Sequence, residues 1–134
     1  MPPKLFTLEE ATSLLPKLEP LVRRLVEIRQ ALRPHEAVIA GFQSRASLTG
    51  GLLPSADLRN SRAKVEQFGA ELREEIRRVE ALGCVVKDTH LGLVDFLARR
   101  GAGEVFLCWR LGEPTIRYWH GLHEGFAGRR PLDE

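Results

Sequence analysis

Residues with reactive side chains gather near the end of the chain, in the stretch LCWRLGEPTIRYWHGLHEG from Leu107 to Gly125. It holds both tryptophans, the only tyrosine, two glutamates, one cysteine and two of the four histidines. A cysteine beside a histidine is a pair used in nucleophilic catalysis. Histidines with carboxylates are ligands for divalent metals. The spacing of these residues decides which chemistry they can perform.

The first candidate pair, Cys108 with His120, depends on the register of a predicted hairpin. A two-residue turn at Gly112-Glu113 makes Val105 face His120 and places Cys108 on the opposite face of the sheet. A four-residue loop keeps this register. A three-residue loop instead puts Cys108 and His120 on one face, diagonal to each other, with ~7 Å or more between their Cα atoms. We expect Cys108 to be a small buried residue and not a nucleophile.

A second candidate is a metal site at His120, His123 and Glu124. Histidines three positions apart converge on one ion only within a helical turn, and Gly121 disfavours a helix there. The HExxH pattern is absent. We therefore expect no cofactor, and these three side chains are the candidates should a divalent metal bind.

Acid–base chemistry requires a carboxylate in a partly dry place. Asp95 lies within the otherwise apolar GLVDFLA. It is either a buried carboxylate, which needs an arginine, a tryptophan N–H or backbone donors as partners, or a residue on the exposed side of an edge strand. Asp95, Glu113 and His120 are the candidate catalytic residues.

Several classes of function have no support in the sequence. The nucleotide-binding patterns GxxxxGK[ST] and GxGxxG and the hydrolase pattern GxSxG are absent. The net charge of +2 comes without a basic stripe, so nucleic-acid binding is not expected. No apolar run approaches the ~18 residues that a membrane span requires. Without a basic, apolar leader or a CxxC pair, we expect a cytosolic protein with free thiols.

The first half of the chain is predicted to be helical. Thr7 and Glu10 fit a capping box that starts a helix at Leu8. Pro16 and Pro20 predict a helix to about Leu15, a kink, and a longer helix to about Leu32, and Pro34 marks the next boundary. Apolar residues with alternating spacings of three and four form a coiled-coil-like seam: Ala11, Leu14, Leu18, Leu21, Leu25, Ile28 and Leu32.

A further helical stretch is predicted from His35 to Ala46, and the loop SLTGGLLPSAD follows. Pro54 and Asp57 favour a second long helix to about Leu82, ended by Gly83. The two long helices are expected to form an antiparallel hairpin.

After Gly83 the pattern changes to short segments rich in β-branched and aromatic residues: CVV, GLVDFLA, EVFLCWRL and TIRYWH. They predict a small antiparallel β-meander of three or four strands. LVDFLARRG is either one of these strands or a helix ended by Gly101, and FAGRRPLDE is expected to be an irregular tail. The predicted class is α+β in a single domain of 134 residues, with a helical part over 1–83 and the meander and tail over 84–134.

The order of several short motifs resembles a small bacterial domain family of unknown function. These motifs are Lys87-Asp88, GLVDF at 92–96, LCW at 107–109, Gly112-Glu113, Ile116, Trp119-His120 and Gly128-Arg129. The likeness covers the whole chain, although Leu97 stands where that family commonly has proline and His123 lies outside its pattern. Besides the catalytic candidates, the motifs contain possible ligand-binding residues: Lys87, Asp88, Trp109, Trp119 and Arg129.

Two hypotheses of function follow. The first is a cytosolic bacterial interaction or regulatory module that forms a homodimer through its helices, because the seam offers more apolar surface than a small sheet covers. A different protein partner is a variant of this hypothesis. The alternative is a small-ligand-binding protein or metal-assisted enzyme, which would use Asp88, Asp95, Glu113 and His120.

Overall fold

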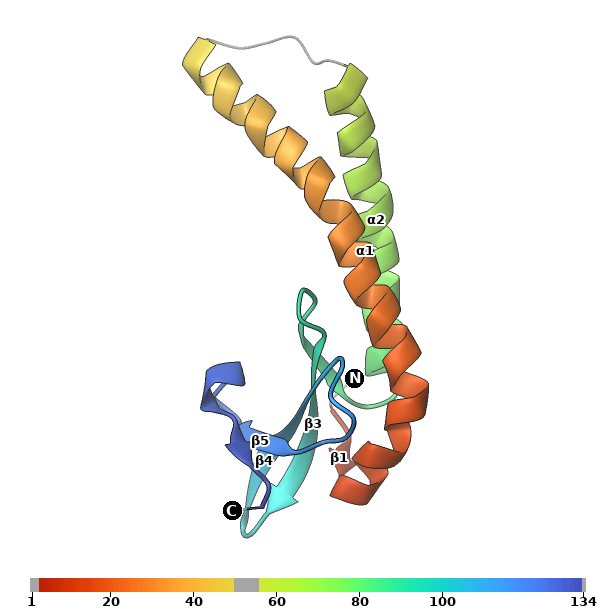
Figure 1. The fold of residues 1–134 in the computed structure, drawn as a ribbon, viewed down its shortest axis with the longest axis vertical. Helices are drawn as coiled ribbons and strands as arrows, with labels where there is room; N and C mark the ends of the chain where they lie inside the picture. The colour runs from red at the N-terminus through yellow and green to blue at the C-terminus, as the bar shows by residue number, and fades with distance from the viewer. Residues whose placement is uncertain (1–2, 50–55, 134) are drawn as a thin grey trace. The chain divides into compact units, whose positions relative to one another are not determined.

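The computed structural model describes residues 3–49 and 56–133 (Figure 1). The chain divides into two compact units, one made of Met1–Val26 with Glu75–Glu134 and the other of Glu27–Glu74. The first unit contains the sheet, and the described residues of the second unit, 27–49 and 56–74, are helical. The α+β class is confirmed. No helix in the described ranges combines the length and the apolar composition needed to span a bilayer.

The helix α1, Leu8–Thr49, begins at the predicted capping box. The amide of Thr7 donates to Oε1 of Glu10 at 2.9 Å, and the amide of Glu10 donates to Oγ1 of Thr7 at 3.1 Å. These two bonds satisfy amides that have no partner within the helix.

The predicted interruptions of this helix are wrong, because α1 continues through Pro16, Pro20 and Pro34. Each proline removes one amide donor and leaves one carbonyl without its helical partner. All three prolines lie on the exposed side of the helix, where water can satisfy that carbonyl. The apolar side is unbroken, and its packing maintains the helix.

The second helix, α2 (Ala56–Glu80), ends two residues before the predicted Leu82. Gly83 follows with φ +103°, which fits its predicted role in ending the helix. Pro54 and most of the loop SLTGGLLPSAD lie outside the described residues.

The predicted meander is wrong in its size and in its topology. The sheet is mixed and has six strands, in the order β1-β3-β4-β5-β6, with β2 also paired to β3. β1 runs parallel to β3, and the other pairs are antiparallel. The strands are β1 (Leu5–Phe6), β2 (Val85–Asp88), β3 (Leu93–Arg100), β4 (Gly103–Arg110), β5 (Tyr118–Gly121) and β6 (Arg130–Pro131).

The added strands are short, which explains why the pattern did not predict them. β1 and β6 have two residues each, too few for an alternation of apolar and polar positions. The segment after Gly125 is therefore not simply an irregular tail, because it contains a 3₁₀ turn, η1 (Phe126–Gly128), before β6. The helical alternative for LVDFLARRG is wrong, since this segment forms β3.

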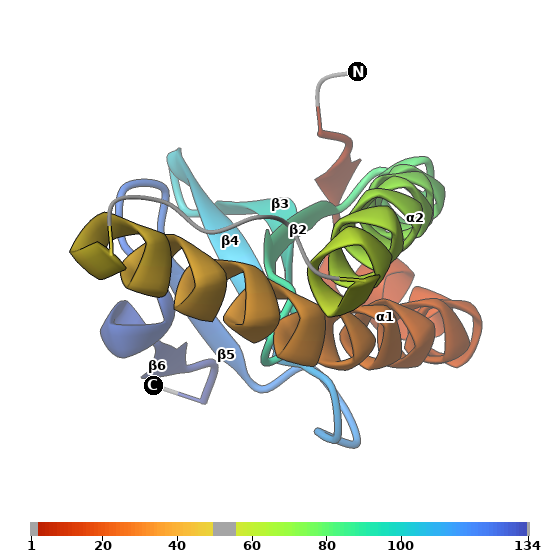
Figure 2. The same cartoon turned by 90° about the horizontal axis from the view of Figure 1, so that it is seen from above.

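β3 and β4 form the long hairpin of the sheet, visible from two sides in Figures 1 and 2. On one face, Phe96 packs edge-to-face against Phe6 of β1, with 5.2 Å between ring centroids. On the same face, Trp109 lines a cavity together with Leu15 and Pro16 of α1. This face of the sheet is therefore the one that meets the start of α1, and its burial stabilises the first unit.

Candidate functional site

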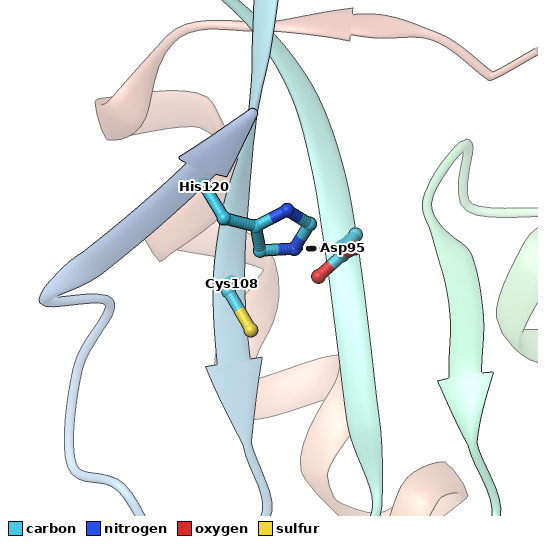
Figure 3. A group of neighbouring side chains, drawn as sticks. All are labelled: Asp95, Cys108 and His120. Carbon is cyan, nitrogen blue, oxygen red and sulfur yellow. Dashed lines mark hydrogen bonds and ion pairs between the residues drawn. The ribbon is translucent and has the colours of Figure 1, made fainter. Parts of the chain in front are cut away.

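Three side chains meet on the other face of the sheet, from three neighbouring strands (Figure 3). Asp95 comes from β3, Cys108 from β4 and His120 from β5. A carboxylate oxygen, the sulfur and a ring nitrogen all lie within 4.8 Å of one another. All three residues are buried. Within the described part of the chain, no other group of three potential metal-binding side chains meets in this way.

The strand register brings these side chains together. Asp95 is paired directly with Cys108, and Phe106 is paired with His120. Residues two positions apart on a strand share a face, so Cys108 and His120 lie on one face as diagonal neighbours. The prediction that they lie on opposite faces is wrong. The connection between β4 and β5, residues 111–117, is longer than the three-residue loop considered above. Like that loop it has an odd number of residues, and it therefore places both side chains on one face.

His120 makes two hydrogen bonds that fix its ring. Its Nδ1 lies 2.8 Å from the carbonyl oxygen of Gly121, and its Nε2 lies 2.8 Å from Oδ2 of Asp95. A carbonyl oxygen only accepts, so Nδ1 carries a proton. The contact between Nε2 and Oδ2 then requires one further proton, because a bare imidazole nitrogen and a carboxylate are both acceptors. Asp95 and His120 therefore share a single proton.

Burial sets the electrostatics of the cluster. It raises the pKa of Asp95, and the effects of His120, Cys108 and Lys87 only partly oppose this. Burial, together with the charge of Asp95, raises the pKa of the Cys108 thiol to about 12. A thiol with a raised pKa holds its proton more firmly than an ordinary cysteine does.

One atom of the cluster lacks a partner. Oδ1 of Asp95 is buried and has no hydrogen-bond partner among the described residues. The Cys108 thiol interacts with this carboxyl group but does not make a hydrogen bond of standard geometry to Oδ1. A buried carboxylate oxygen without a partner is unfavourable, and such atoms are rare in folded proteins.

The cluster lines a cavity of about 250 Å³. Lys87 and Asp88 of β2 border this cavity, as does Phe126 of η1. The Nζ of Lys87 lies 4.6 Å from the centroid of the Phe106 ring, a cation–π contact that holds the ammonium group near the cavity. Phe126 is exposed, and the cavity is open to solvent in part.

Glu113, the third predicted catalytic residue, does not belong to this cluster. Its Oε1 accepts from Nη2 of Arg129 at 2.6 Å and from the amide of Arg110 at 2.7 Å. The same Nη2 of Arg129 donates to the carbonyl oxygen of Cys108 at 3.2 Å. Glu113 therefore reaches the cluster only indirectly, through Arg129 and the backbone of β4.

Of the other predicted ligand-binding residues, Asp88 borders the cavity of the cluster, whereas Trp109 and Trp119 do not line it. Asp88 holds a turn, since its Oδ1 accepts from the amides of His90 and Leu91 at 2.8 and 2.9 Å. Trp109 is buried on the opposite face and donates from Nε1 to the carbonyl of Glu113 at 2.9 Å. Trp119 contacts two guanidinium groups by cation–π stacking, those of Arg100 and Arg130.

The metal ligands suggested by the spacing of His120, His123 and Glu124 do not converge. His123 is exposed. Glu124 accepts from the amide of Gly121 at 2.7 Å and pairs with Arg130 at 3.1 Å. Only His120 of these three belongs to the buried cluster. The sequence pattern missed Cys108 as its neighbour, and the sole signal for it was the alternative hairpin register.

The helical unit has a polar pair of its own. Nδ1 of His35 on α1 lies 3.1 Å from Oγ of Ser61 on α2. Both residues line a groove of about 450 Å³ beside Val38. A hydroxyl inside a helix has no free backbone amides nearby, so the backbone offers no oxyanion hole to this pair.

Comparison with known proteins identifies the family of the chain but does not give an activity. The model of one family, described as an uncharacterized conserved protein (DUF2203), matches residues 4–132. No curated protein and no solved structure matches the chain. The match covers both helices and all of the sheet strands described above. The chain thus belongs to the DUF2203 family of uncharacterized conserved proteins.

Proposed function

We propose that the protein binds a small polar molecule in the cavity beside Asp95 and His120 and transfers a proton to or from it. One observation carries this proposal: a buried carboxyl–imidazole pair shares one proton and borders a cavity of about 250 Å³. General acids and bases are groups of this kind, held in a partly dry place. A small-ligand-binding protein without catalysis is the minimal form of the same proposal.

The surroundings of the pair support an anionic ligand. Lys87 brings a positive charge to the cavity, and Asp95 can stay protonated there because burial raises its pKa. A carboxylate or phosphate group would be attracted by the ammonium group of Lys87, which can donate a charge-assisted hydrogen bond to it. The small cavity suits a molecule of few atoms.

In this proposal the remaining predicted residues have supporting roles. Asp88 shapes the turn next to the cavity, and its Oδ1 is engaged with two backbone amides. Glu113 orients Arg129, which contacts the backbone of Cys108. Neither residue is proposed to touch the ligand.

Ligand binding can be tested by NMR on the isotopically labelled full chain. A set of small carboxylates and inorganic phosphate should shift the amide signals of β3, β4 and β5, and Lys87→Gln should weaken this binding at least tenfold. Lys64→Gln is the matched control, because Lys64 also lies over a phenylalanine ring, that of Phe68, in the helical unit. Shifts that are absent, or equal in the two variants, would refute the proposal.

An interaction module that dimerises through its helices is a second candidate. The seam does not favour it, because five of its seven residues are buried within one chain: Ala11, Leu18, Leu25, Ile28 and Leu32. The observation in its favour is the groove of about 450 Å³ in the helical unit, beside the exposed Val38. The proposed occupant is a second copy of the chain.

Light scattering over a range of micromolar concentrations tests this dimer. Wild type should give the mass of two chains and Val38→Glu the mass of one. A monomeric wild type would remove the candidate.

The compartment proposed for either function is the bacterial cytosol. A bacterial origin is what the sequence resemblance implies, and the two buried free cysteines, Cys84 and Cys108, suit a reducing environment. Fractionation of bacterial cells that express the untagged chain, with detection by antibody, checks the location. Recovery in the periplasm would contradict it.

A further inference from the structure

We propose that Asp95, Cys108 and His120 are three protein ligands of a single zinc ion. The inference rests on the ligand-binding form of the proposed function, because the ion would sit in the wall of the same cavity. With the ion bound, the pair of Asp95 and His120 holds no proton, so the ion takes the place of proton transfer by that pair. It rests on four features of the cluster: its donor atoms, the orientation of the imidazole, the unpartnered carboxylate oxygen and the balance of charge.

The donor set is the first argument. Sulfur, imidazole nitrogen and carboxylate oxygen are the three ligand types that zinc takes in proteins. Calcium and magnesium prefer oxygen ligands alone, and iron–sulfur clusters require more thiolates than Cys108 supplies. The three atoms lie within 4.8 Å of one another on a rigid sheet face, so small rotations of the side chains bring them around one ion.

The imidazole is already oriented for a metal. Nδ1 of His120 donates to the carbonyl of Gly121 at 2.8 Å. In metal sites the non-ligating nitrogen of a histidine commonly makes such a bond, which fixes the tautomer and leaves the other nitrogen as the ligand. Here that other nitrogen is Nε2, which faces Asp95.

The unpartnered Oδ1 of Asp95 is an independent indication of a ligand. This carboxyl group is only 1% exposed, and Oδ1 has no hydrogen-bond partner among the described residues. A cation at the cluster would satisfy the carboxylate, which the three surrounding strands do not fully do.

Charge and protons balance when zinc binds. The ion displaces the proton shared by Asp95 and His120 and the proton of the Cys108 thiol, so two protons leave the protein. One carboxylate, one thiolate and a neutral imidazole then neutralise the two charges of zinc. A buried site of net charge zero avoids the desolvation cost of an uncompensated ion.

The fourth coordination position is left to solvent or a ligand. Glu124, which lines the cavity, is engaged with the amide of Gly121 and with Arg130. Asp88, the other carboxylate of the cavity, caps a turn. Three protein ligands and one open position are the arrangement of catalytic zinc sites.

Metal binding to the untagged full chain, after treatment with a chelator, tests the inference. Zinc is titrated in competition with a chromogenic chelator, and cobalt(II) is used as a spectroscopic probe. We expect one ion per chain and a thiolate-to-cobalt charge-transfer band. Cys108→Ser should abolish the band and weaken zinc binding by more than ~100-fold, since changes outside the first coordination sphere alone cost 10–100-fold.

Cys84→Ser is the matched control. Cys84 is also a buried free cysteine, and its thiol donates to the carbonyl of Val79, a bond that serine can keep. The control should bind zinc like wild type. Circular dichroism checks folding, and His120→Gln replaces Cys108→Ser if that variant does not fold. No binding by wild type, or equal binding by wild type and the cluster variants, would overturn the inference.

The two proposals fail separately. Zinc binding without any effect of small anions in the NMR experiment would leave a structural metal site and refute the proposed function. Anion binding to a chain that takes up no zinc would refute the metal site alone.

Discussion

Nε2 of His120 lies 2.8 Å from Oδ2 of Asp95, a residue 25 positions earlier, and both side chains are almost fully buried. The contact spans β4 and joins β3 to β5, on the sheet face opposite to the one that meets the start of α1. A buried pair of this kind contributes little net stability compared with apolar residues, but it is strongly destabilising to break from one side. The effect of a substitution on stability should therefore depend on whether the new side chain keeps the hydrogen bond of the pair.

The two partners should differ in their response to substitution in the metal-free protein. His120→Ala leaves the Asp95 carboxyl buried without its partner and should lower the free energy of unfolding by about 3–5 kcal/mol. Asp95→Asn keeps a donor for Nε2, because its amide N–H can replace the shared proton, and should cost about 1 kcal/mol. Urea unfolding at neutral pH measures both values, and equal losses would contradict the shared-proton arrangement.

The stability of the metal-free protein should depend on pH through Asp95. Its pKa is raised in the folded state by burial, above the ordinary value of 3.8. Between the two values the Asp95 carboxyl group holds more protons in the folded chain than in the unfolded chain. The contribution of Asp95 is therefore fully present below about 3.8 and is lost as the pH rises through the raised value.

The measurement is the difference in free energy of unfolding between wild type and Asp95→Asn across this pH range. As the pH rises, the free energy of unfolding of Asp95→Asn should increase relative to that of wild type. The change should be at most ~1.4 kcal/mol per pH unit, which is the slope for one proton. A difference that stays constant, or that shifts in favour of wild type, would mean that burial does not control this carboxyl group.

The sequence predicted the groups of the cluster better than their arrangement. Asp95 was singled out because it is an acidic residue in an otherwise apolar segment, and in the structure it is buried. Its partner, His120, was not among the donors expected for a buried carboxylate. Local pattern describes one strand at a time, whereas a buried hydrogen bond joins residues that only the sheet register brings together.

The register itself depends on the hairpin connection. A slip of one residue moves every side chain of a strand to the other face. Cys108 pairs with Tyr118, so the connection between β4 and β5 has an odd number of residues. The predicted Gly-Glu turn has an even number.

The prolines of α1 also show that a local pattern can be overruled by packing. Their local effect on the backbone was outweighed by packing along the whole apolar side of the helix.

Arg129 should matter far more than its neighbour Arg130. The guanidinium of Arg129 stacks on Tyr118 at 4.1 Å and pairs with the half-buried Glu113 at 2.6 Å. Arg129→Ala should lower the free energy of unfolding by about 1.5–3 kcal/mol, the range for a hydrogen bond to a charged group. Arg130 pairs with Glu124 at the surface, so Arg130→Ala should cost no more than about 1 kcal/mol.

Urea unfolding of both arginine variants at one pH makes this comparison. Arg129→Lys is informative as well, because it keeps the charge and loses the planar stacking. It should fall between wild type and Arg129→Ala. Similar losses for Arg129→Ala and Arg130→Ala would show that the link from Glu113 to β4 is unimportant.

Gly83, at the end of α2, should tolerate alanine much less well than Gly101, although both have positive φ angles of +103° and +62°. An added Cβ at Gly83 would lie 2.7 Å from Cβ of Lys4 and 3.2 Å from Cζ of Phe6. Lys4 cannot easily withdraw, because its amide donates to the carbonyl of Gly83 at 2.9 Å. At Gly101 no described heavy atom lies within 4 Å of the added Cβ.

Gly101→Ala should therefore show only the cost of a left-handed backbone, about 1–2 kcal/mol. Gly83→Ala adds a steric clash of about 1–3 kcal/mol, and it should loosen β1, whose Leu5 and Phe6 follow Lys4. Urea unfolding gives the two free energies, and hydrogen exchange of the Lys4 amide reports on β1. If both alanine variants lose the same free energy and the Lys4 amide stays protected, then the contact between Gly83 and Lys4 does not hold β1 against the sheet.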